Sequence, residues 1–246
     1  MVTPFAEGAV LRAGRQAGAI VIDQLAGHGT LLVLAPHPDD ETLGCGAALA
    51  AASRIGCKVI VVALTDGRMS HPRSKMFPPE RLIALRQSEL VDAVCILTRG
   101  QGHVIPLGFP DQGMTHDDIQ QARKRLLDIV DESKVGVIWT TWEADPHPDH
   151  QLAARLGREV VEARPDVVLW RFPVWGRFTE KAPLANDVLY RFSSEPFSAQ
   201  KAAAIAAHSS QMTRLIHDDP DGFVMGAQTR RHFLASPELF LGEVHA

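Results

Sequence analysis

Ala35-Pro36-His37-Pro38-Asp39-Asp40-Glu41 directly follows the apolar run Leu31-Leu32-Val33-Leu34 and precedes a stretch rich in small residues, Thr42 to Ile55. The apolar run is typical of a central parallel strand covered on both faces, and the small-residue stretch predicts a helix. A strand therefore delivers one imidazole and two adjacent carboxylates to its own carboxyl end, where open α/β sheets place their ligands. This stretch decides the fold, because it predicts a strand-to-helix unit with polar residues at one sheet edge.

A second polar cluster, Asp145-Pro146-His147-Pro148-Asp149-His150, follows the apolar run Val135 to Thr141 much further along the chain. On a first helical turn, histidines at positions i and i+3 lie on the same side of the helix. Pro148 fits such a turn because it has no N–H to lose there. Either cluster alone is equally consistent with a helix cap. Because both follow apolar strands, we predict that they meet at one sheet edge around one metal ion.

Strands and helices alternate through the rest of the chain. We predict strands over residues 58–64, 103–107, 135–141, 167–172 and 187–192, and helices over residues 80–97, 117–131, 151–163 and 196–207, with a further helix within residues 1–30. Such alternation is typical of βαβ units. The predicted fold is α/β, a Rossmann-like and mainly parallel sheet with helices on both faces and the active site at the C-terminal strand edge. We expect one domain over residues 1–246, with a core at 31–211 and an irregular C-terminal cover.

Composition restricts the class of protein. The chain has 246 residues, of which 46% are hydrophobic and 22% charged, as in an ordinary globular protein. A formal charge of −4 leaves no basic surface, so we expect no nucleic-acid partner. Three cysteines without a CxxC spacing argue against a disulfide framework. Neither a signal pattern nor an apolar run of membrane-spanning length is present, so we expect a cytoplasmic protein without a membrane span, and a homo-oligomer stays open.

The first cluster contains both a metal-binding pattern and a spare carboxylate. Where the backbone is extended, the adjacent Asp39 and Asp40 side chains point in different directions. One can then bind a metal ion while the other faces the water molecule on that ion. Imidazole and carboxylate ligands suit Zn²⁺, and Fe²⁺ or Co²⁺ fit the same donors. Cys45, flanked by glycines, favours tight helix packing over ligation.

The two clusters together resemble one known family. Ala35 to Glu41 with Gly44-Cys45-Gly46, followed by His147-Pro148-Asp149-His150, is similar to the PIG-L-like (LmbE-like) zinc-dependent de-N-acetylases. Weaker landmarks of that family also match, namely Leu64-Thr65-Asp66-Gly67, Arg86 with Glu89, Leu107-Gly108-Phe109-Pro110-Asp111 and Ala207-His208-Ser209-Ser210-Gln211. The resemblance spans residues 31 to 211, and its specificity comes from the two histidine motifs in this order.

This resemblance implies an amidohydrolase that removes an N-acetyl (acyl) group from an amino sugar or sugar conjugate through a zinc-activated water. His37, Asp40 and His150 would bind the zinc ion. Asp39 would be the general base, and His147 the acid or the stabiliser of the oxyanion. Three protein ligands leave one position on zinc open, as catalytic zinc requires. The residues do not decide whether Asp39 or His147 returns a proton to the leaving amine.

The resemblance also implies substrate contacts. Arg86 and Asp111 match positions that hold the sugar, so the expected partner is a small-molecule N-acylated sugar or conjugate. Several relatives carry a tyrosine shortly before the second motif, whereas this chain has Thr141-Trp142-Glu143-Ala144-Asp145, and Tyr190 is its only tyrosine. This departure puts in doubt both a phenol contributed by that loop and an unmodified sugar as the substrate.

Two other functions stay open. The divergent loop before Asp145 and the long segment after Phe172 are consistent with zinc-dependent hydrolysis of another amide or an ester. A non-catalytic metal- or sugar-binding module is the third hypothesis, and Asp39 argues against it, because a binding site has no use for a spare carboxylate. His208, with Gln211, is either a helix-end polar residue or part of the site wall. The irregular segment 215–231 is either a substrate-facing flap or an inert excursion.

Overall fold

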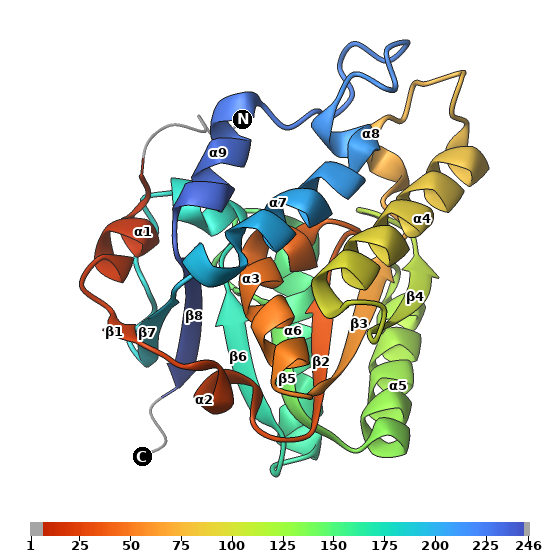
Figure 1. The fold of residues 1–246 in the computed structure, drawn as a ribbon. Coiled ribbons are helices and arrows are strands. Elements are labelled where there is room, and N and C mark those ends of the chain that lie inside the picture. Colours follow the sequence, from red (N-terminus) through yellow and green to blue (C-terminus); the bar gives the residue numbers. More distant parts are fainter. Residues whose placement is uncertain (1–6, 244–246) are drawn as a thin grey trace.

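The computed structural model describes residues 7–243, and within them eight strands form one sheet (Figure 1). The strand order is β1-β7-β8-β6-β5-β2-β3-β4. Every neighbouring pair is parallel except the two pairs made by β8, which runs antiparallel to β6 and β7. The strands are β1 (Gly18–Ala19), β2 (Thr30–Ala35), β3 (Lys58–Thr65), β4 (His103–Phe109), β5 (Val135–Thr141), β6 (Val168–Phe172), β7 (Asp187–Phe192) and β8 (Glu238–Glu243). The predicted mainly parallel α/β fold is confirmed.

Alternating residues of the central strands pack into two separate cores. Leu31 and Val33 of β2 belong to the core under α3 (Asp40–Arg54), α4 (Pro79–Thr98) and α7 (Ser198–Ala207). Leu32 and Leu34 belong to the core under α5 (His116–Ser133) and α6 (Pro148–Ala163) on the opposite face. Figure 1 shows α3, α4 and α7 in front of the sheet. Because both faces of β2 are buried in this way, the strand is apolar at nearly every position.

Shorter elements complete the fold, and one of them corrects a prediction. The single helix expected within residues 1–30 is instead α1 (Ala9–Gly14) and α2 (Ile22–Ala26), separated by β1. β1 pairs with β7 in register Gly18↔Tyr190, so the sheet edge takes up the residues that would have joined the two helices. The remaining elements are η1 (Arg68–Ser70), η2 (Trp175–Phe178), η3 (Glu195–Phe197), α8 (Ser209–Met212) and α9 (Ala227–Ala235).

The order of the strands reverses between β2 and β5. β3 and β4 extend the sheet on one side of β2, whereas β6 follows β5 on the other side. The helices that follow β2 and β5, α3 and α6, therefore cover opposite faces of the sheet. Such a switch point leaves a crevice beyond the carboxyl ends of the two strands. Both polar clusters predicted from the sequence begin at this crevice.

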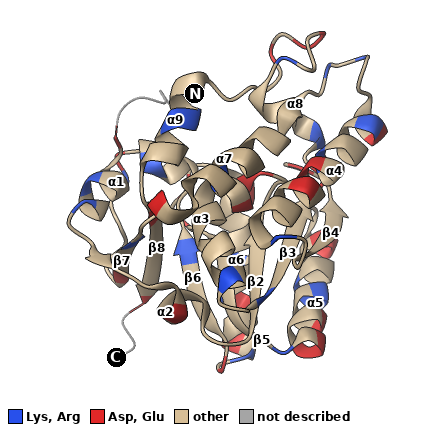
Figure 2. Ribbon diagram, in the orientation of Figure 1, with Lys and Arg blue, Asp and Glu red and all other residues tan. Residues whose placement is uncertain are grey.

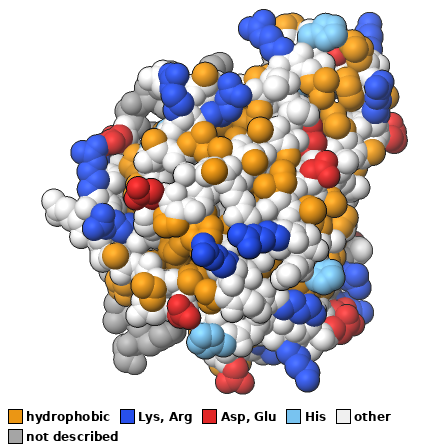
Figure 3. Space-filling view, viewed as in Figure 1, with side chains coloured by type: hydrophobic (Ala, Val, Ile, Leu, Met, Phe, Trp, Pro, Cys, Tyr) orange, Lys and Arg blue, Asp and Glu red, His pale blue; other side chains and the backbone are white. Residues whose placement is uncertain are grey.

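Charged residues of both signs are mixed on the outside. Figure 2 shows basic and acidic residues interspersed along α5, and Figure 3 shows hydrophobic side chains interspersed with charged ones over the face formed by α4 and α7. Within residues 7–243, none of the helices combines the length and the apolar character needed to cross a membrane.

Helix α3 is broken in its middle by a buried ion pair. Cys45 has non-helical dihedral angles (φ −141°, ψ 20°). Glu238 of β8 accepts hydrogen bonds from Ala47 N at 2.7 Å and Ala48 N at 2.8 Å, and so caps the second part of the helix. Lys201 of α7 binds Glu238 at 2.6 Å and donates to Leu43 O at 3.0 Å at the end of the first part. Both charges are fully buried, so each depends on the other.

We predict that Glu238→Ala lowers the free energy of unfolding by roughly 3–5 kcal/mol, because it leaves the Lys201 ammonium buried without its counter-ion. Equilibrium denaturation with urea measures this loss. Asp131→Ala is the control, since it removes an exposed ion pair with Arg164 and should cost less than about 1 kcal/mol. Equal losses in the two variants would show that the buried pair does not hold the broken helix.

Candidate metal centre and active site

The two polar clusters meet in space as predicted. His37 lies just beyond the end of β2, and His147 and His150 lie at the start of α6 beyond β5. The ring centroid of His37 is 4.7 Å from that of His147 and 5.4 Å from that of His150. The proximity follows from the parallel pairing of β2 with β5, in which Leu34 lies opposite Thr140.

Asp40 links two of the imidazoles. Its Oδ2 atom lies 3.1 Å from Nδ1 of His37 and 3.2 Å from Nε2 of His150. Donors at the usual zinc distance of 2.0–2.1 Å in a tetrahedral site lie about 3.3 Å apart, so these separations suit ligands of a shared ion. His37, His147 and His150 can also bring one nitrogen each to within 4.8 Å of the others. The cluster thus offers a carboxylate and up to three imidazoles.

His150 fits a metal better than it fits a hydrogen-bonded ion pair. Its side chain is fully buried, and among residues 7–243 neither ring nitrogen makes a well-directed hydrogen bond. Nδ1 lies 3.2 Å from Oδ1 of Asp145, the arrangement by which a carboxylate orients a metal-binding imidazole. Nε2 is then left with its lone pair for a cation. Burial would lower the pKa of His150, but Asp40 and Asp145 raise it to about 9 in the chain alone.

His37 is oriented by two further carboxylates. Its Nε2 atom lies 3.1 Å from Oδ2 of Asp149 and 3.3 Å from Oδ1 of Asp111, whereas its Nδ1 faces Asp40. Asp111 is fixed in turn by Met69 N, which donates to its Oδ2 at 3.0 Å. Burial would raise the pKa of Asp111, but the contact with His37 lowers it to about 2. Asp149 is a site residue that the sequence did not single out, although it lies within the quoted motif.

Asp39 occupies the N-cap position of α3 but does not act as a cap. Its carbonyl accepts from Thr42 N and Leu43 N, while its carboxylate makes no capping bond within the described part of the chain. The carboxylate faces the cavity instead, 3.4 Å from Nη2 of Arg86. Burial raises the pKa of Asp39 to about 6, with Arg86 opposing this effect and Asp40 adding to it. A carboxylate with a raised pKa is suited to accept and return a proton near neutral pH.

His147, in contrast, is a cap as well as a site residue. It is the N-cap of α6, and its Nδ1 accepts from Asp149 N at 3.2 Å. A neutral imidazole that accepts at Nδ1 carries its proton on Nε2. Burial and the nearby His37 and His150 lower the pKa of His147, so the neutral ring is favoured at pH 7. His147 therefore presents an N–H donor to the cavity.

The cavity has a volume of about 570 Å³, and His37, Asp40 and His147 of the candidate metal cluster line its wall. Arg86 and Asp111, predicted to hold the substrate, also line it, together with Ser70, Gln112 and Gln211. Arg86 has its Nη1 and Nη2 atoms occupied by Gly67 O and Pro38 O. The apolar side of the cavity is formed by Trp175, Phe178, Phe223, Val224 and Met225.

The C-terminal segment 215–231 forms part of this wall. Phe223 N donates to Ser70 O at 2.7 Å, and Met225 N donates to Gln211 O at 2.8 Å, so the segment is attached to the loop after β3 and to α8. Residues 223–226 and Thr229 face the cavity. Of the two interpretations of this segment, the structure supports the one that places it at the site. Tyr190, in contrast, packs on Trp170 within the sheet.

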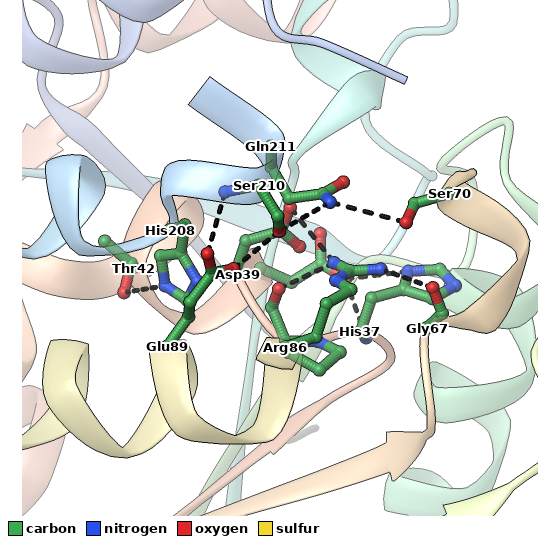
Figure 4. A network of polar contacts seen from close by, with 12 residues as sticks. His37, Asp39, Thr42, Gly67, Ser70, Arg86, Glu89, His208, Ser210 and Gln211 are labelled. Carbon is green, nitrogen blue, oxygen red and sulfur yellow. Dashed lines mark hydrogen bonds and ion pairs between the residues drawn. The ribbon is translucent and has the colours of Figure 1, made fainter. Parts of the chain in front are cut away.

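The sequence left His208 as a helix-end polar residue or part of the site wall and Glu41 as a helix-start charge, and the structure brings the two together. His208, which follows α7, places Nε2 at 3.3 Å from Oε1 of Glu41. Figure 4 shows His208 beside Thr42, with Asp39 and Arg86 in the same network. The landmark residue Glu89 of α4 binds the start of α8, where it accepts from Ser209 Oγ, Ser210 N and Ser210 Oγ.

Comparison with known proteins identifies the family. A family model described as PIG-L, GlcNAc-PI de-N-acetylase, matches residues 32–161, which is more than half of the chain. The chain therefore belongs to this family, as the two histidine motifs predicted.

Three individual relatives each share less than a third of the aligned residues with this chain. The chain is 26% identical over 136 residues to diacetylchitobiose deacetylase of Thermococcus kodakarensis, but the alignment covers only 53% of this chain and 48% of that protein. It is 29% identical over 195 residues to a probable N-acetyl-alpha-D-glucosaminyl L-malate deacetylase of Bacillus cereus, covering 76% and 86%. A solved structure of a conserved protein from Thermus thermophilus matches with a TM-score of 0.62 at 31% identity, covering 85% and 92%.

We predict that His150→Ala loses zinc affinity by more than the roughly 10–100-fold that removal of an outer-shell partner costs, as expected if His150 is a metal ligand. Asp39→Asn should keep one zinc ion per chain, since its carboxylate is the spare one. Isothermal titration and metal analysis after dialysis measure both. His116→Ala, at an exposed position on α5, is the control. Retention of tight zinc binding by His150→Ala would exclude His150 as a ligand.

Proposed function

We propose that this chain is a metal-dependent deacetylase that removes an N-acetyl group from an amino sugar conjugate. The observation that carries the proposal is the cavity lined by His37, Asp39, Asp40 and His147, with His150 buried behind it, 3.2 Å from Asp40. Membership of the de-N-acetylase family supports the reaction, and the names of the relatives support an N-acetylated sugar as substrate. Zinc is the proposed ion, held by His37, Asp40 and His150.

When bound, the ion would polarise the amide carbonyl and make a water molecule more acidic. The chain supplies the remaining chemistry. Asp39 accepts the proton of the attacking water, and its carboxylate faces the cavity beside Asp40. His147, neutral and protonated at Nε2, donates a hydrogen bond to the carbonyl oxygen as negative charge develops on it. One such donor is typically worth about 10²–10³ in rate.

Asp39 is also the proposed source of the proton for the leaving amine. It holds the proton taken from water, and because a carboxylic acid is a stronger acid than an alkylammonium group, return of that proton to the amine is favourable. His147 is a poorer acid, because protonation at Nδ1 would break its hydrogen bond with Asp149 N. The products are then a carboxylic acid and a free amine, and Asp39 ends the cycle ionised.

A non-polar group on the substrate is favoured by the apolar side of the cavity. Trp175 and Phe223 contact each other with ring centroids 5.9 Å apart, and Trp175 is partly exposed to the cavity. Val224, 37% exposed, extends this apolar side toward solvent. A free sugar would leave most of this surface in water. The proposed substrate is therefore an N-acetylated sugar conjugated to an apolar group.

We predict that Asp39→Asn lowers kcat by about 10²–10⁴-fold, as expected for loss of a general base. The assay follows release of free amine from N-acetylated sugars and acyl-amino acids, and release of carboxylic acid from aryl esters. Only the N-acetylated sugars should be hydrolysed. Because only ionised Asp39 acts as base, kcat/KM should fall as pH decreases, with a midpoint no higher than about 6, since a bound cation lowers the pKa further. A midpoint above pH 7, or a fully active Asp39→Asn, would contradict the assignment.

We predict that an alkyl or aryl glycoside of N-acetylglucosamine has a KM roughly tenfold lower than the free sugar, because it buries apolar surface against the wall. Phe223→Ala should remove most of this difference while changing kcat little. Steady-state kinetics on the matched pair of substrates measures the effect. If the glycoside and the free sugar had equal KM values in the unmodified protein, the apolar side would not bind substrate.

A further inference from the structure

The peptide bond between Pro38 and Asp39 is held from both sides by buried side chains. Arg86 Nη2 donates to Pro38 O at 2.7 Å, and Asp39 N donates to Oε2 of Glu41 at 3.0 Å. Figure 4 shows Arg86 reaching this turn from α4. Arg86 and Glu41 are 3% and 0% exposed. Because the carbonyl and the amide belong to the same planar unit, the two hydrogen bonds fix its rotation.

The fixed peptide coincides with strain at Asp39. This residue has φ 146° and ψ −25°, on the side of the φ/ψ map that favours glycine. Such a conformation persists only where the surrounding structure over-determines it, and it is concentrated at functional sites. The strained residue is the proposed base itself, and its conformation turns the carboxylate away from the capping position and toward the cavity.

Glu41 is held in place by a second layer of contacts. Its Oε1 atom accepts from Thr42 Oγ1 at 2.5 Å and lies 3.3 Å from Nε2 of His208. Its Oε2 atom binds Asp39 N, so both carboxylate oxygens are occupied. Glu41 and His208 are both 0% exposed, and among the described residues neither belongs to the cavity lining. The Glu41 carboxylate reaches the cavity through its hydrogen bond with Asp39 N.

We propose that Glu41 and His208 are positioning residues for Asp39, and this inference rests on the proposed function. Together with Arg86 they fix the Pro38–Asp39 peptide and so aim the Asp39 carboxylate at the reacting water. A displacement of about 1 Å at such a group costs about 10²-fold in rate. A glutamate in the first turn of a helix also interacts favourably with the helix dipole. That effect depends on the negative charge of Glu41, whereas positioning of Asp39 depends on the hydrogen bond that Glu41 accepts.

Four substitutions separate these roles. Glu41→Leu and His208→Leu remove the hydrogen bonds, whereas Glu41→Gln keeps an acceptor for Asp39 N and His208→Gln keeps a donor for Glu41. We expect the leucine variants to lose about 10²-fold in kcat with KM within about threefold. The glutamine variants should stay within about tenfold of the unmodified protein, and all four should keep one zinc ion per chain. Glu132→Gln, at an exposed position on α5, is the control.

A double variant tests whether Glu41 acts through Asp39. In the Asp39→Asn background, Glu41→Leu should lower the residual rate no further, because a residue that acts through Asp39 has no effect once the base is gone. A leucine variant with kcat within threefold of the unmodified protein would overturn the proposal. So would a loss of kcat that appears only together with a loss of zinc, or an equal loss in the leucine and glutamine variants.

A thermal unfolding comparison tests the strain without any substrate. Glycine tolerates the Asp39 conformation and alanine does not, so Asp39→Gly should melt about 2–4 °C above Asp39→Ala. The difference should vanish in the Glu41→Leu background, where the peptide is free to rotate. A higher melting temperature for Asp39→Ala, or a difference that persists with Glu41→Leu, would show that Glu41 does not impose the conformation. This comparison decides the inference even if no deacetylation is found.

Discussion

The parallel pairing of β2 with β5 is the constraint on which the site depends. Each strand contributes one polar cluster, and the register that sets Leu34 opposite Thr140 brings the two strand ends side by side. Because the strand order reverses here, α3 and α6 leave toward opposite faces of the sheet and the crevice between them stays open. Asp40, at the start of one helix, can then contact His150, at the start of the other, at 3.2 Å. No local property of either cluster would bring these two side chains together.

The buried crevice separates the chemistry of two carboxylates that are adjacent in the sequence. Asp40 contacts two imidazoles, which hold its pKa well below the usual range despite burial, whereas burial raises the pKa of Asp39 to about 6. When the environments of two neighbouring carboxyl groups separate their pKa values in this way, one group stays ionised and the other is suited to proton transfer. The unusual φ of Asp39 accompanies a carboxylate that faces the cavity, 3.4 Å from Nη2 of Arg86, whereas the Asp40 carboxylate contacts the imidazoles.

Much of this arrangement follows from local sequence patterns. The central strands are apolar at every position because both faces are buried, and the small residues of α3 permit its close approach to the sheet, so both were predictable. The residues that position the site were not. Glu41 has the pattern of a helix-start charge, and its contact with His208 depends on how α7 packs across α3. Likewise, β8 lies antiparallel between β6 and β7. Hydrophobic periodicity cannot show that Glu238, at the start of β8, accepts a hydrogen bond from the backbone of α3.

The C-terminal third therefore determines the site without contributing a predicted metal ligand. Besides its apolar packing on α3, α7 places Lys201 at the break in that helix, and His208, just beyond the last turn of α7, contacts Glu41. The segment that follows supplies the apolar side of the cavity through Phe223 and Val224. Residues 32–161, which match the family, contain the proposed metal and acid–base residues. Residues beyond them shape the cavity and, as proposed above, hold the conformation of Asp39. Divergence in that third can thus change the substrate while the two histidine motifs stay the same.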